Sequence, residues 1–239
     1  RILVPASAWA LALGRPGWID AAYMAVVLAS VGAGVWFAAL WFASHGVSVW
    51  WGLLFLATPA TVTSVDRMGI DAMLLAFGVG AAVMWRQQRW AWMWILLALA
   101  GLTRETGVLM ACGAALGLWA QRHWLRGVAM AFAALPAVAW ALLLRIWIGG
   151  FVLGHPIQFL YAGMIREAGL SEAHPEQWAV KAAWLLKVAG LAGLALCVPV
   201  AARWFQRGGE LWWIVAGFVP LALLLGAPVF LETPVAFGR

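Results

Sequence analysis

The chain has 239 residues, of which 66% are hydrophobic and only 10% are charged, and its formal net charge is +6. A soluble domain is about 45–50% apolar and about 25% charged, so this composition excludes an ordinary soluble domain and predicts a helical membrane protein. The basic residues are dispersed over short segments between apolar stretches, which is typical of orientation signals and not of nucleic-acid binding.

The apolar stretches predict the helices in chain order. They run roughly over residues 2–13, 19–43, 47–65, 69–85, 90–103, 107–120, 127–148, 182–202 and 211–231. A span needs about 20 residues, so the first stretch, bounded by Arg1 and Arg15, favours an interfacial helix. We therefore expect an all-α transmembrane bundle of about eight spanning or half-spanning helices plus this interfacial helix, in one domain over residues 1–239.

The loops predict how the helices are oriented. Loops 86–89, 121–126 and 203–209 contain arginines and no acids, which places them on the cytoplasmic side. Residues 90–120 connect two of these loops and must therefore enter and return. They predict a hairpin with two arms of about 14 residues, roughly 21 Å each, and a tip at residues 103–106. Because the hydrocarbon core is about 30 Å thick, this tip should lie slightly below the outer surface.

Two charged islands interrupt the apolar sequence. Arg104 and Glu105 lie at the hairpin tip, whereas Asp66, Arg67 and Asp71 lie between two earlier apolar stretches. Charges within membrane sequence are costly and normally face a bundle interior or a wet cavity. Successive loops alternate between the inner and the outer side, and this alternation places both islands at the outer side. There we expect the residues that can carry chemistry to gather. His45 and Gly46 then form the tight turn at the inner side.

Each island has a structural and a functional interpretation. Asp66 with Arg67, or Arg104 with Glu105, can be a local ion pair. Asp71 can stabilise the start of the following helix. In the functional interpretation Arg67 or Arg104 binds a phosphate, with Glu105 orienting Arg104. A carboxylate then acts as a general base or binds a cationic group. The two interpretations of Arg104 are compatible.

Other motifs are weak or absent. The sequence contains no GxSxG, HExxH or Walker loop. Glu172, His174 and Glu176 have a nonspecific spacing for a metal site, so a solvated loop is favoured and neither a metal nor a cofactor is expected. Gly113 and Gly117 have the spacing of small residues that predicts close helix packing.

The order of these features resembles a known family. Asp66 to Asp71 open an apolar helix, a basic inner loop follows, and Leu102-Thr103-Arg104-Glu105-Thr106 precedes another apolar helix. This pattern is similar to the GT-C superfamily of membrane glycosyltransferases, relatives of the protein mannosyltransferases and the lipid A aminoarabinose transferases. The most similar branch is bacterial and has an arginine–glutamate–threonine motif at this tip. The resemblance covers about residues 1–147, including Arg1 at the end of that branch's first outer loop.

The resemblance implies a multi-pass glycosyltransferase of the bacterial inner membrane whose active face is periplasmic or extracellular. The donor would be a polyprenyl-phosphate-linked sugar, the acceptor a glycan, lipid or protein, and membrane lipid would surround the bundle. Asp66 and Asp71 are the catalytic candidates, and the substrate-binding candidates are Arg67, Arg104, Glu105 and Arg1. The family's main catalytic aspartate lies in the first outer loop, ahead of Arg1. We therefore expect a fragment that is inactive alone, without its first span and truncated at the C-terminus.

A transporter or flippase for a lipid-linked or charged solute is the alternative. It too has intramembrane charges and short broken helices. It predicts internal repeats, and the sequence shows no convincing self-similarity. An intramembrane protease would need a Ser/His pair or two aspartates at the same depth in the membrane, and this sequence has neither arrangement.

Overall fold

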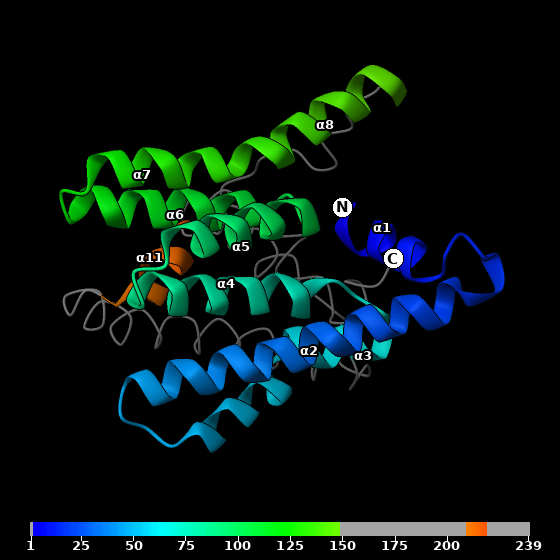
Figure 1. Cartoon of the computed structure of the whole chain (residues 1–239), viewed down its shortest axis with the longest axis horizontal. Coiled ribbons are helices and arrows are strands. Elements are labelled where there is room, and N and C mark those ends of the chain that lie inside the picture. The colour runs from blue at the N-terminus through cyan, green and yellow to red at the C-terminus, as the bar shows by residue number, and fades with distance from the viewer. Residues whose placement is uncertain (1, 149–208, 219–239) are drawn as a thin grey trace, which may run out of the picture.

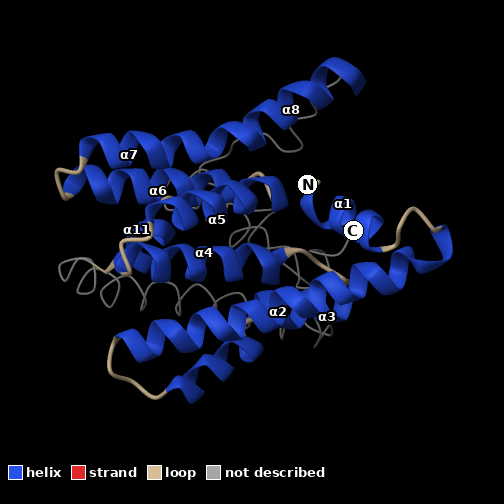
Figure 2. Cartoon of the chain, viewed as in Figure 1, coloured by secondary structure: helices blue, strands red, loops and turns tan. Residues whose placement is uncertain are grey.

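The computed structural model describes residues 2–148 and 209–218, and within these residues every regular element is helical (Figures 1 and 2). The elements in chain order are α1 (Leu3–Leu11), η1 (Pro16–Trp18), α2 (Ile19–Ser44), η2 (Val49–Ala57), α3 (Pro59–Arg67), α4 (Asp71–Arg86), α5 (Trp90–Thr103), α6 (Gly107–Ala120), α7 (Trp124–Ala131), η3 (Phe132–Ala134), α8 (Leu135–Ile148) and α11 (Glu210–Ala216). The expected span 182–202, the outer loop 149–181 and most of 211–231 lie outside the described residues.

Two helical segments, Pro16–Ser44 and Trp124–Leu144, are long and apolar enough to cross a membrane. Only 33% of the apolar window of the first and 17% of that of the second are buried, whereas a core helix of a soluble protein is mostly buried. Their outward faces carry large apolar side chains such as Trp36 and Leu142. The all-helical class is therefore confirmed for the described residues, and the number of spans stays a prediction.

The segment Trp124–Ile148 changes from α-helix to a short 3-10 turn and back to α-helix. The 3-10 turn η3 separates α7 from α8 just before Pro136. A proline has no N–H to donate to the carbonyl four residues earlier, and its ring crowds the preceding turn. The short 3-10 turn accommodates the proline without ending the segment.

The predicted hairpin is confirmed, because α5 ends at Thr103 and α6 begins at Gly107. A Cβ at Gly107 would overlap the Ala100 carbonyl group, so only glycine allows the two arms to approach so closely at the tip. The predicted tight turn at His45 and Gly46 is confirmed too, since α2 ends at Ser44 and Gly46 has φ of 73°, whereas its location at the inner side stays a prediction. That value lies in the left-handed region, which glycine adopts readily.

The predicted span over residues 47–65 is wrong as a continuous helix. The segment forms the 3-10 helix η2 and the separate helix α3, with a break at Thr58. Pro59 restricts the preceding residue to an extended conformation, and Thr58 has φ −69° and ψ 141°. The hydroxyls of Thr58 and Thr61 donate to the carbonyl of Phe55 at 2.9 and 2.8 Å. The Phe55 carbonyl also accepts from the Thr58 N–H at 3.2 Å, so it is satisfied at the break, which is therefore compatible with an apolar surrounding.

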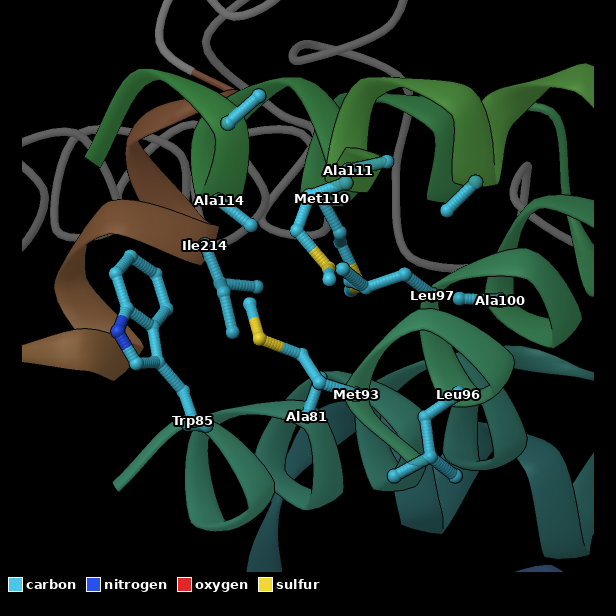
Figure 3. Packing of buried hydrophobic residues seen from close by; sticks show 14 of the residues in the cluster. Ala81, Trp85, Met93, Leu96, Leu97, Ala100, Met110, Ala111, Ala114 and Ile214 are labelled. Carbon is cyan, nitrogen blue, oxygen red and sulfur yellow. The ribbon is translucent and has the colours of Figure 1, made fainter. Parts of the chain in front are cut away.

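The main core lies between α4, α5, α6 and α11 (Figure 3). Figure 3 shows Trp85 and Met93 converging on Ile214, while Leu97 lies beside Met110. These side chains come from four helices, and Met93, Leu97 and Ile214 are almost completely buried. Close van der Waals packing of these side chains fixes the hairpin against α4.

Glycines bring α6 and α11 close together, as the Gly113/Gly117 spacing predicts. A Cβ at Gly113 would overlap the carbonyl oxygen of Trp213, and one at Gly117 would lie 2.5 Å from the Trp213 ring. A side chain at either position would therefore push α11 away from the core. This close packing holds Glu210, the first residue of α11, next to the end of α4.

Candidate active site

Arg104 extends from a well-defined turn. It leaves the helical conformation at the end of α5, with φ −148° and ψ 141°. Its N–H still donates to Ala100 at 3.1 Å, and its carbonyl accepts from the N–H of Gly107 at 2.8 Å. The preceding Thr103 is buried and its hydroxyl donates to the Leu99 carbonyl at 2.8 Å. The backbone on both sides of Arg104 is therefore fixed by hydrogen bonds.

Asp71 lies at the start of α4, and residues of α3 fix this start. The Ser64 hydroxyl oxygen is fully buried and accepts from the Ala72 N–H at 2.8 Å, which satisfies one of the open donors of α4. Met68 ends α3 in the left-handed conformation with φ of 50°, so the chain can turn into α4. A carboxylate at a helix N-terminus is stabilised by the helix dipole, as the structural interpretation of Asp71 proposed.

The structure brings Asp71 and Arg104 together. Nη1 of Arg104 donates to Oδ1 of Asp71 in an ion pair between residues that lie 33 positions apart in the chain. The side chains are 31% and 37% exposed, so the pair is partly sheltered. The prediction that the two charged islands meet at one end of the bundle is confirmed for these two residues. Among the described residues Arg104 pairs with Asp71, whereas the sequence suggested its neighbour Glu105.

One edge of the Arg104 guanidinium has a donor without an acceptor. Its Nε is buried and has no hydrogen-bond partner among the described residues. Nε and Nη2 form the edge that binds two oxygens of a phosphate or carboxylate, and the contact with Asp71 uses Nη1 and not this edge. A buried donor without an acceptor costs about 1–3 kcal/mol, and an anion bound at this edge would recover that free energy.

The other candidate residues remain candidates by position. Asp66 is exposed in the last turn of α3, and Glu105 is exposed at the hairpin tip. Arg67 is the last residue of α3, but its side chain is outside what the structure describes, as is all of Arg1. Because Asp71 alone of the two predicted aspartates pairs with Arg104, the structure separates two residues that the sequence left equivalent.

The short helix α1 belongs to this end of the bundle, which the sequence analysis missed. The N–H of Ile2 donates to the carbonyl of Leu102, directly before the hairpin tip, at 3.1 Å. Val4 and Ala8 are buried, and Val4 packs with Val26 of α2 and Met73 of α4. The i, i+4 spacing of Val4 and Ala8 was the available signal for this buried face. The interfacial location of α1 stays a prediction.

The ion pair lies closer to the middle of the bundle than the ends of the longest helical segments do. Figure 1 shows that the start of α4 and the tip between α5 and α6 stop short of the start of α2 and the end of α8. This follows from length, because α5 and α6 have 14 residues each and α2 has 26. The short arms thus place the two charges within the length of the apolar helices.

No protein-family model, no curated protein and no solved structure matches this chain. The interpretation of the site therefore depends on its geometry and on the sequence pattern.

Proposed function

We propose that the chain is the membrane-embedded part of a GT-C-like glycosyltransferase that moves a sugar from a polyprenyl-phosphate donor to a cell-surface or periplasmic acceptor. The observation that carries this proposal is the Asp71–Arg104 pair with the open donor edge of Arg104. An arginine held in this way offers a phosphate two parallel charge-assisted hydrogen bonds. The Leu102-Thr103-Arg104-Glu105-Thr106 motif supports the same assignment.

The proposed location is the bacterial inner membrane, with a multi-pass topology. Exposed tryptophans occur near both ends of the bundle: Trp50, Trp51 and Trp124 near the basic loops, and Trp9, Trp18 and Trp147 near the hairpin tip. Indole rings prefer the headgroup layer, so two groups of this kind support a bundle that crosses the bilayer. The arginines of loops 86–89 and 121–126 support a cytoplasmic position for the first group and an outer position for the tip.

The proposed reaction places Arg104 at the leaving group. The bond between the anomeric carbon and the phosphate oxygen breaks, and the electron pair stays on the phosphate. The acceptor hydroxyl oxygen forms the new glycosidic bond, and its proton passes to a carboxylate. Arg104 stabilises the charge that develops on the phosphate, and donors placed in this way are worth about 100-fold to 1,000-fold in rate.

Asp71 has a positioning role in this proposal. Its contact with Nη1 holds the guanidinium so that Nε and Nη2 are directed to the phosphate. The resemblance places the base that accepts the proton in the family's first outer loop, and Asp66 and Glu105 are exposed carboxylates at this end. The apolar helix surfaces next to the site can accommodate the hydrocarbon chain of the donor, which a water-exposed site cannot do.

A binding experiment tests the assignment of Arg104. Detergent-solubilised protein is titrated with farnesyl phosphate and, as the control ligand, with farnesol. We expect Arg104→Gln to weaken farnesyl phosphate binding at least about tenfold, since charge-assisted hydrogen bonds contribute about 1.5–3 kcal/mol. Arg15→Gln, at an exposed arginine of the same end, is the matched control and should bind like the wild type. Equal binding of farnesyl phosphate and farnesol would reject a phosphate site.

A transfer assay distinguishes the proposal from the transporter alternative. The protein is reconstituted in liposomes with a radiolabelled polyprenyl-phosphate sugar and a crude envelope acceptor fraction. A transferase moves the label into a new glycoside that is stable to mild acid, which cleaves the glycosyl phosphate. A transporter or flippase moves the intact lipid-linked sugar across the bilayer and forms no glycoside, and that result would overturn the proposal.

A further inference from the structure

The end of the bundle opposite the Asp71–Arg104 pair carries two basic loops. Residues 86–89 connect α4 to α5, and residues 121–126 lead from α6 into the start of α7; neither segment contains an acid. Figure 1 shows both turns at the same end. The basic face consists of Arg89, Arg122 and Arg126 with the neighbouring Trp92 and Trp124. We infer that this basic face binds the headgroups of anionic phospholipids. This inference depends on the proposed membrane location and not on glycosyl transfer.

Aromatic contacts hold the two segments together. The guanidinium carbon of Arg126, at the start of α7, lies 4.5 Å from the centroid of the Trp90 ring, at the start of α5. The Trp119 indole N–H donates to the Trp124 carbonyl at 3.3 Å. A Cβ at Gly127 would overlap the Trp119 ring, so glycine allows α7 to begin close to α6. The arginines of the two segments are therefore held as one surface.

The charges of the basic face have no compensating acid among the described residues. Arg86 is different, because it donates to the Ser44 carbonyl at 3.0 Å and forms an ion pair with Glu210 at 3.7 Å. The side chains of Arg89, Arg122 and Arg126 are exposed and make no hydrogen bond or ion pair with another described residue. Neighbouring like charges repel each other, so a multivalent or densely packed anion is the ligand that such a surface fits.

The residues around these arginines indicate a lipid as the source of the anion. Trp92, Trp124 and Leu125 are exposed beside them, and Leu125 is 88% exposed. Indole rings and an exposed leucine are more stable in contact with lipid than with water, and the arginines can form charge-assisted hydrogen bonds with phosphate. An anionic phospholipid supplies both within one molecule, and basic residues near a membrane surface are attracted to such headgroups. A soluble phosphate would leave the apolar side chains in water.

The test compares lipids that differ only in headgroup charge. Protein purified in a zwitterionic detergent is mixed with phosphatidylglycerol, with phosphatidylcholine of the same acyl chains, or with inorganic phosphate, and its apparent Tm is measured. We expect phosphatidylglycerol to raise the Tm by at least about 4 °C and the other two additives to raise it little. Native mass spectrometry should show phosphatidylglycerol retained on the protein.

Variants separate the basic face from other charges. Arg122→Gln with Arg126→Gln should abolish most of the phosphatidylglycerol shift, whereas Arg122→Lys with Arg126→Lys should keep most of it. Arg15→Gln, at the opposite end, should keep the full shift. An equal shift in the glutamine variant, or an equal effect of inorganic phosphate or phosphatidylcholine, would overturn the inference. Farnesyl phosphate binding should be unchanged in the glutamine variant, so this test and the test of Arg104 fail independently.

Discussion

The two ends of the bundle use arginine in opposite ways. At the hairpin tip one partly sheltered arginine is held by an aspartate from another helix, and its buried Nε has no acceptor within residues 2–148 and 209–218. At the other end Arg86 caps the last turn of α2, while three further arginines are exposed and pair with no acid in the described part of the chain. A fixed, single arginine suits recognition of one ligand in one orientation. A group of exposed arginines suits a surface that attracts many anions with little selectivity.

The largest effect should come from the aspartate that fixes Arg104. Asp71→Ala removes the contact that orients the guanidinium, and small misplacements at a reacting group cost on the order of 100-fold in rate. We expect glycosyl transfer by the complete gene product to fall by about this factor in a protein that is still folded. Asp20→Ala, at an exposed aspartate in the first turn of α2, is the matched control, and we expect a smaller loss. The reverse order of the two variants would show that the ion pair does not position a catalytic group.

The helix α11 packs closely against α6, so a larger residue at a contact glycine should lower the Tm more than the same change at an uncontacted glycine. Gly113→Ala places a methyl group against the backbone of Trp213, and overpacking of this kind costs about 1–3 kcal/mol. We expect the apparent Tm in detergent to fall by several degrees. Gly32→Ala makes the same chemical change in α2, where a Cβ meets no described atom within 4 Å. If both variants unfold at the same temperature, α11 does not pack as described.

Two serines at opposite ends give a smaller, matched comparison. Ser64→Ala leaves the buried N–H of Ala72 without an acceptor and should destabilise the protein by about 1 kcal/mol, as the loss of a helix cap does. Ser44→Ala removes an exposed hydroxyl that donates within its own helix, and its effect should be a few tenths of a kcal/mol. Chemical or thermal unfolding in detergent measures the difference. A larger loss for Ser44→Ala would contradict the burial of the α4 start.

A similarly small effect is expected at Arg86. Arg86→Gln removes the partly exposed ion pair with Glu210 and the contact with the end of α2, and exposed pairs contribute about 0.2–1 kcal/mol. Salt screens such pairs, so the loss should shrink when the unfolding is repeated at high ionic strength. Glu210→Gln should reproduce the salt-sensitive part of the loss. A loss that is independent of salt would show that the hydrogen bond to Ser44 dominates.

Local sequence was sufficient for the hairpin and for one turn. Basic loops at both ends of residues 90–120 force the segment to return, and the polar tip marks where it does so; α5 and α6 have the predicted bounds. The sequence contains a local signal against one continuous helix over residues 47–65. Pro59 restricts Thr58 and ends a helix there, but the absence of charged residues from the segment favoured one continuous stretch.

By itself the sequence determined the helical class, the position of the charged islands and the hairpin, because these depend on residues that are close in the chain. Only the tertiary structure decided that Asp71 and not Asp66 contacts Arg104, and that α1 packs beside the hairpin tip. Asp66 and Asp71 are five positions apart and chemically identical, so no local pattern separates them. Their difference arises because α3 ends and α4 begins between them, and because the packing of α4 against the hairpin brings just one carboxylate to the guanidinium.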